Sequence, residues 1–76
     1  MTTNINELEI YLKNYKYAYT AHDRFLEVFH SKSGNIINII DNYYGYEITY
    51  NGKVSYAADE LEVMYVLNPL MSKRKL

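Results

Sequence analysis

The sequence predicts a small α+β protein that forms a single domain over residues 1–76. An N-terminal helix, or two helices, precedes a three-stranded antiparallel meander and a C-terminal helix. Two observations indicate this fold. Apolar residues recur at helical spacing before Gly34, and neither glycine nor proline interrupts them. After Gly34 the chain is rich in β-branched and aromatic residues, with Asn51-Gly52 between two such runs. A chain of 76 residues is the size of one domain.

The N-terminal region carries an apolar ladder with alternating steps of three and four residues. Its members are Ile5, Leu8, Leu12, Tyr15, Tyr19, His22, Leu26 and Phe29. Tyr15, Tyr17 and Tyr19 also alternate as in a strand, but that period covers three residues and the helical period covers eight. We therefore expect helix between residues 4 and 32.

The length of this helical region leaves two arrangements open. A single helix over residues 4–32 would be about 43 Å long, whereas a globule of this size is only about 25 Å across. One unbroken helix would therefore protrude and pair with another chain. We favour a break, with helices over about 4–18 and 21–32 and Thr20 capping the second. Gly34 then serves as the C-terminal cap.

The Asn51-Gly52 pair predicts the central feature of the sheet. Both residue types tolerate positive φ, as a type I′ hairpin turn requires. The two-residue turn pairs Tyr50 with Lys53, Ile48 with Ser55 and Tyr46 with Ala57. A first strand over 36–40, connected through "DNYYG" at 41–45, would place the strand 46–50 in the centre.

The C-terminal helix is expected to begin after Asp59. Glu62 lies three residues later, in a capping-box arrangement. Pro69 predicts that the helix ends or kinks at Asn68. Residues 72–76, "SKRKL", are expected to form a basic, flexible tail.

Charge and composition limit the classes of function. The net charge is −1 and the isoelectric point is about 6.0, unlike that of a typical nucleic-acid-binding domain. The absence of cysteine excludes disulfides and thiolate chemistry. The apolar runs are too short to span a membrane, and the N-terminus has no secretion-signal pattern. We expect a cytoplasmic protein without a membrane partner.

The sequence does not indicate catalysis or metal binding. Glu27 and His30 have the spacing of metal ligands on a helix, but no second ligand set accompanies them. They and His22 are expected to be ordinary helical side chains. Cap or turn positions explain all three glycines, so a phosphate-binding loop is not indicated. We expect a protein that is not an enzyme and that binds no cofactor or metal.

The ten tyrosines are the strongest functional signal. Tyrosine offers a wide contact area with a polar tip and is enriched at interfaces, although such residues can also simply fill an amphipathic surface. The predicted protein-binding residues are Tyr43, Tyr44, Tyr46, Tyr50 and Tyr17. The predicted self-association residues are Leu8, Leu12, Tyr15 and Tyr19. The predicted phosphate contacts are Lys73, Arg74 and Lys75.

These observations favour a protein-binding module, with the chain also forming a homo-oligomer. In size, charge and lack of catalytic motifs it resembles small accessory proteins of phages and mobile elements. Such proteins commonly bind one host protein, defence nucleases included, and block it by occlusion. Two alternatives remain open: a nucleic-acid-associated regulator that uses the basic tail, and a purely structural homo-oligomer.

Overall fold

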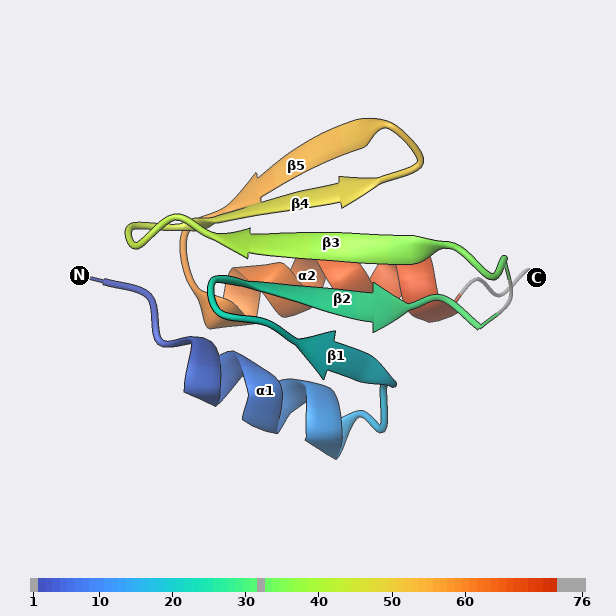
Figure 1. The fold of residues 1–76 in the computed structure, drawn as a ribbon, viewed down its shortest axis with the longest axis horizontal. Coiled ribbons are helices and arrows are strands. Elements are labelled where there is room, and N and C mark those ends of the chain that lie inside the picture. Colours follow the sequence, from blue (N-terminus) through green and yellow to red (C-terminus); the bar gives the residue numbers. More distant parts are fainter. Residues whose placement is uncertain (1, 32, 73–76) are drawn as a thin grey trace.

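The computed structural model describes residues 2–31 and 33–72 and confirms a small α+β architecture (Figure 1). Over these residues the elements are α1 (Ile5–Asn14), β1 (Tyr19–Ala21), β2 (Phe25–Phe29), β3 (Ile36–Asp41), β4 (Tyr46–Tyr50), β5 (Lys53–Ala57) and α2 (Glu60–Ser72). The strands pair in chain order, and each pair is antiparallel. The sheet is therefore a meander with β1 and β5 at its edges.

One hydrophobic core joins the sheet to both helices. In Figure 1, α2 runs behind the sheet, and α1, drawn below β1 in this view, packs against α2. The buried apolar residues are Leu8, Leu12, Leu26, Val28, Ile37, Ile39, Tyr46, Ile48, Ala57, Val63, Met64 and Leu67. Along β2, β3 and β4 these residues alternate with more exposed ones, as expected of a sheet with one covered face.

The β4–β5 hairpin has the predicted turn and register. Asn51 and Gly52 have φ values of 52° and 80°, as a type I′ turn requires. Tyr50 pairs with Lys53, Ile48 with Ser55 and Tyr46 with Ala57. The sheet is larger than predicted, however, so β3 occupies the centre and β4 is the fourth of the five strands.

The N-terminal helix is shorter than predicted because it ends at a left-handed lysine. Lys16 has a φ of 61°. Its N–H donates to the Lys13 carbonyl, and the Tyr17 N–H donates to the Leu12 carbonyl. These two bonds form a Schellman motif, a helix ending that usually places glycine where this chain has Lys16. The expected helical region 4–18 therefore stops at Asn14.

The second predicted helix, over residues 21–32, is replaced by strands. β1 and β2 form a hairpin in which Tyr19 pairs with Val28. Within β2, Leu26 and Val28 are buried while Phe29 is exposed, so the period is two and not 3.6. The ladder had placed Leu26 and Phe29 on one face, and that expectation is wrong.

The C-terminal helix begins as predicted and continues past Pro69. The Glu62 N–H donates to Asp59 Oδ1 at 2.9 Å, which caps the first turn. Pro69 lies inside α2, where it lacks the N–H that would bond to the carbonyl of Tyr65. Both residues are exposed, on the solvent side of the helix.

His30 supports the last turn of α2 from the end of β2. It is only 3% exposed, although the sequence had suggested a helical side chain with more contact to solvent. Its Nδ1 accepts from the Ser33 N–H at 3.0 Å. Nε2 therefore carries the proton that is donated to the Leu70 carbonyl, 2.8 Å away. This bond satisfies one of the carbonyls that a helix end leaves without an intrahelical donor.

Candidate functional site

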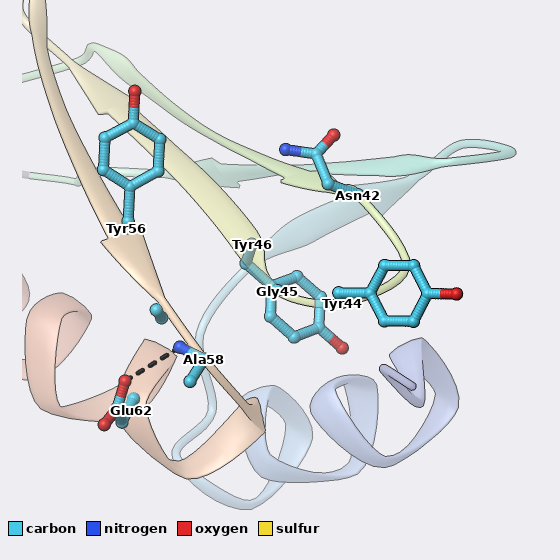
Figure 2. Close-up of a pocket in the computed structure, with 8 residues that line it drawn as sticks. Asn42, Tyr44, Gly45, Tyr46, Tyr56, Ala58 and Glu62 are labelled. Atoms are coloured by element: carbon cyan, nitrogen blue, oxygen red, sulfur yellow. Dashed lines mark hydrogen bonds between the residues drawn. The ribbon is translucent and has the colours of Figure 1, made fainter. Parts of the chain in front are cut away.

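A hollow of about 470 Å³ lies where the β3–β4 loop meets the junction of β5 and α2 (Figure 2). Its lining residues are Asn42, Tyr44, Gly45, Tyr46, Tyr56, Ala57, Ala58 and Glu62. They come from the loop, from adjacent parts of β4 and β5, and from the first turn of α2. The hairpin register brings them together, because Tyr46 at the start of β4 pairs with Ala57 at the end of β5.

The loop beside the hollow is held by its own backbone and by the N-terminal segment. Asp41 Oδ1 accepts from the Tyr43 N–H at 2.9 Å and from the Thr3 hydroxyl. The Thr3 N–H also donates to the Tyr43 carbonyl, at 2.6 Å. Tyr43 itself has a φ of 73°, a strained value for a residue with a side chain. These bonds fix the backbone from which Tyr44 projects.

Two exposed tyrosines stand on either side of the hollow. Tyr44 on the loop is 78% exposed and Tyr56 on β5 is 73% exposed. Figure 2 shows the two rings apart from each other, with Gly45 and Tyr46 between them. Tyr43 extends this surface: its ring centroid lies 6.4 Å from that of Tyr44, and the Arg24 guanidinium lies 4.2 Å above it.

Tyr46 forms the floor of the hollow and is tied to α2. Its hydroxyl donates to Glu60 Oε2 at 2.6 Å, and the same oxygen accepts from the Asn4 N–H at 2.6 Å. Burial, followed by the hydrogen bond to Glu60 and the negative charge of that carboxylate, raises the pKa of Tyr46 well above its ordinary value of 10.0. The buried contact therefore connects the N-terminus, β4 and α2.

This raised pKa predicts a loss of stability in alkaline solution. Above pH 10 the unfolded chain releases the Tyr46 proton and the folded chain retains it. The contribution of Tyr46 to the free energy of unfolding is therefore fully present below pH 10 and falls as the pH rises above 10. The contribution of Tyr46 to the slope is about 1.4 kcal/mol per pH unit. Urea unfolding between pH 8 and 11 should show a smaller loss for Tyr46→Phe than for the wild type. Equal slopes for the two proteins would contradict the assignment.

Gly45 is required by close packing and not by its backbone angle. A Cβ built at this position would lie 2.9 Å from the Ala57 carbonyl oxygen, which is a backbone atom. We predict that Gly45→Ala lowers the free energy of unfolding by about 1–3 kcal/mol, the usual range for overpacking. Denaturant titration measures the change. In the control, Gly52→Ala, the added Cβ meets nothing within 4 Å, and strain at positive φ is the only cost. A Gly45→Ala protein as stable as the wild type would contradict the close approach.

Three carboxylates lie at the hollow or next to its lining residues in the strand pairing or the sequence. Glu62 lines the hollow, and its Oε1 accepts from the Ala58 N–H at 2.8 Å. Glu47 lies opposite Tyr56 in the strand pairing, and Asp59 follows directly after the lining residue Ala58. The hollow is thus aromatic with an acidic margin.

The structure separates the predicted tyrosines into three groups. Tyr44 lines the hollow, Tyr43 precedes it on the loop, and both are exposed. Tyr46 is 1% exposed and is a core residue. Tyr50 and Tyr17 are half-buried; the Tyr50 hydroxyl lies 3.2 Å from Ser33 Oγ, and the Tyr17 hydroxyl donates to Asn68. The surface we consider below therefore excludes Tyr46, Tyr50 and Tyr17.

Tyr56 is the residue that the sequence analysis did not select. The signal that identifies it is its register: strand alternation and the Asn51-Gly52 turn place Tyr56 opposite Glu47, on the face away from Tyr46.

The residues predicted for self-association do not form a shared surface. Leu8 and Leu12 are fully buried in the core of their own chain. Tyr19 is in β1 and donates to Glu9, whereas Tyr15 caps α1 and is 52% exposed. The helical ladder is therefore used for intramolecular packing, which removes the reason to expect dimerisation along it.

The predictions for the C-terminal tail concern residues that the structure mostly does not describe. Lys73, Arg74 and Lys75, the proposed phosphate contacts, lie outside the described residues, as does most of the predicted tail. Between residues 2 and 72, apart from residue 32, no group of three His, Cys, Asp or Glu side chains is arranged to hold a metal ion. In the same part of the chain, neither helix has the length and apolar character to cross a membrane.

Comparison with known proteins returned no matching family model, no matching curated protein and no matching solved structure.

Proposed function

We propose that this chain is a small cytoplasmic protein-binding module, and that its binding surface is the tyrosine hollow. We define the tyrosine hollow as the lined cavity together with Tyr43, Tyr44 and Tyr56. The main support for this proposal is that Tyr44 and Tyr56, on either side of that cavity, are 78% and 73% exposed. Exposed aromatic clusters of this kind mark interaction sites.

The backbone segments that carry Tyr44 and Tyr56 are held in place, which makes this surface suited to binding. The loop that carries Tyr44 is held by the bonds from Thr3 and Asp41, and β5 holds Tyr56 in the sheet. Tyrosine side chains also have few rotatable bonds, so little entropy is lost when a partner fixes them. A preorganised aromatic surface of this kind concentrates binding energy in a few residues.

The acidic margin specifies the partner. Glu62 lines the hollow, Glu47 pairs with Tyr56, and Asp59 follows the lining residue Ala58, so a partner surface with lysine or arginine beside apolar residues is complementary. Arg24, which stacks over Tyr43, shows the same cation–π chemistry within the chain itself. Nucleic acid is disfavoured at this surface, because its phosphates would approach these carboxylates.

The mode of action that we propose is occlusion. A bound protein of this size covers part of its partner's surface without needing a reaction of its own. Inhibition of a host protein, as by a phage or mobile-element accessory protein, follows if the covered surface includes that protein's active site. A defence nuclease, whose active site faces the phosphate backbone of its substrate, commonly has a basic surface that would match the acidic margin.

Capture from the native host tests this proposal. The wild-type chain should retain one specific protein, and Tyr44→Ala should bind that protein about 30-fold more weakly, the effect of losing about 2 kcal/mol. Tyr15→Ala is the matched control, because Tyr15 is also exposed but caps the far end of α1. Equal binding by the wild type and Tyr44→Ala would contradict the proposed site.

A further inference from the structure

The two edge strands of the sheet differ in length. β1 has three residues, whereas β5 has five residues and pairs only with β4 (Figure 1). Over residues 2–31 and 33–72, no further strand adds to β5. The outer side of β5 therefore presents backbone N–H and C=O groups without partners in the sheet.

The hairpin register identifies these free groups. A two-residue turn is closed by a hydrogen-bonded pair, here Tyr50 and Lys53. Hydrogen-bonded and non-hydrogen-bonded pairs then alternate. The backbone groups of Lys53, Ser55 and Ala57 point to β4, whereas those of Val54 and Tyr56 point outward.

β5 lacks the features that usually protect an edge strand. It contains no proline, and its pairing with β4 runs without a bulge from Lys53 to Ala57. Lys53 is the single charge, and it lies at the turn end of the strand. Val54 and Tyr56 are 47% and 73% exposed. An edge without a bulge and with a single charge is a template for another strand.

We propose that the β5 edge binds the same edge of a second copy of this chain, in antiparallel orientation, to form a two-fold symmetric dimer with a continuous sheet. The outward groups of Val54 and Tyr56 fix the register. When Val54 of one copy pairs with Tyr56 of the other, each of the five residues of one strand lies opposite a residue of the other strand. The two-fold axis then passes between the two Ser55 residues, which form a non-hydrogen-bonded pair.

The side chains are compatible with this register. Val54 meets Tyr56 on the outer face of the sheet, a β-branched and aromatic pair of the kind that stabilises neighbouring strands. The two Ser55 hydroxyls meet on the other face. Antiparallel pairing also places Lys53 of each copy opposite Ala57 of the other copy. Asp59 of that other copy follows two residues later, so opposite charges come near each other. A parallel arrangement would instead place the two lysines together.

This inference does not depend on the tyrosine hollow as a binding site for another protein. The dimer is measured on the purified chain alone. Tyr56 belongs to both surfaces, so Tyr44→Ala, which leaves β5 unchanged, tests the hollow separately, and either proposal can fail without the other. The dimer replaces the helical self-association predicted from the sequence with a surface that the fold leaves open.

A charge placed on the two-fold axis tests the dimer. Sedimentation of the wild type at rising micromolar concentration should show a monomer–dimer equilibrium. Ser55→Lys opposes a lysine to its own copy and should weaken the dimer about 100-fold, as should Ser55→Glu. Mixing the two variants should restore a dimer. A monomeric wild type at high micromolar concentration, or a Ser55→Lys dimer as tight as the wild type, would overturn the proposal.

Disulfide trapping tests the register with a smaller change. The chain has no cysteine, so Ser55→Cys introduces the one thiol of each copy. Non-hydrogen-bonded partners have Cα atoms about 4.5 Å apart, within the range of a disulfide, and mild oxidation should link the copies. In the control, Val54→Cys, the two thiols belong to residues about 8–9 Å apart and should not link. Equal cross-linking of both variants, or of neither, would overturn the register.

Discussion

Replacing Leu12 with alanine is expected to lower the free energy of unfolding by about 2–5 kcal/mol, the range for truncating a fully buried leucine. Leu12 is 0% exposed and belongs to the last turn of α1. A helix of ten residues is marginal without tertiary packing, so the contacts of Leu8 and Leu12 with the core hold α1 in place. Guanidinium unfolding, followed by circular dichroism, measures the change.

Ile10→Ala is the matched control for this prediction. Ile10 lies on the same helix and is 57% exposed, so its truncation should change stability by less than about 0.5 kcal/mol. The self-association of the protein should be the same in both variants, because Leu12 packs inside its own chain. A Leu12→Ala protein as stable as Ile10→Ala would contradict the position of α1. If folded Leu12→Ala lost the dimer, self-association through the residues of the helical ladder would be the better explanation.

Removing both exposed rings of the tyrosine hollow is expected to weaken binding of its protein partner strongly. If Tyr44 and Tyr56 each contribute about 2 kcal/mol and act independently, the double alanine variant should bind about 1,000-fold more weakly. Its stability should remain within about 1 kcal/mol of the wild type, because both side chains are largely exposed. Calorimetric titration of the captured partner gives the affinities, and the two single variants complete the cycle.

The salt dependence of the same titration separates the proposed site from nucleic-acid binding. Contacts to a phosphate backbone weaken steeply with ionic strength, whereas an interface that rests on aromatic rings should weaken only modestly. Full binding by the double alanine variant, together with loss of binding when residues 73–76 are deleted, would favour the nucleic-acid alternative.

The sequence predicted the C-terminal half of the fold well because its signals there are local. Asn51-Gly52 specifies both the turn and the register, and Asp59 with Glu62 marks the start of α2. The N-terminal half was harder, because Lys16 takes a conformation for which glycine is the usual marker. With α1 extended past its true end, the period-two alternation of β2 was interpreted as part of a helix. Tertiary contacts of Leu26 and Val28 with the core decide the strand, and a local pattern does not contain them.

The candidate site could be predicted only in part for a similar reason. Tyr43 and Tyr44 were selected because two adjacent aromatic residues in a loop lack an obvious core partner. Tyr46 was included with them. Its alternation with Ile48 places it in the core, where its hydroxyl donates a hydrogen bond to Glu60. The register places Tyr56 on the outer face of β5, but its position beside Tyr44 depends on the β5–α2 junction, which brings the end of β5 next to the β3–β4 loop.

Mapping of amide chemical shifts on the ¹⁵N-labelled chain, with the captured partner added, tests the tyrosine hollow most directly. Our account predicts that the largest perturbations cluster at residues 42–46 and 56–62, which line or adjoin the hollow. The amides of Lys13 to Lys16, at the far end of α1, should remain unchanged. Perturbations concentrated on α1 or on the C-terminal residues 73–76, with residues 42–46 unaffected, would contradict the account.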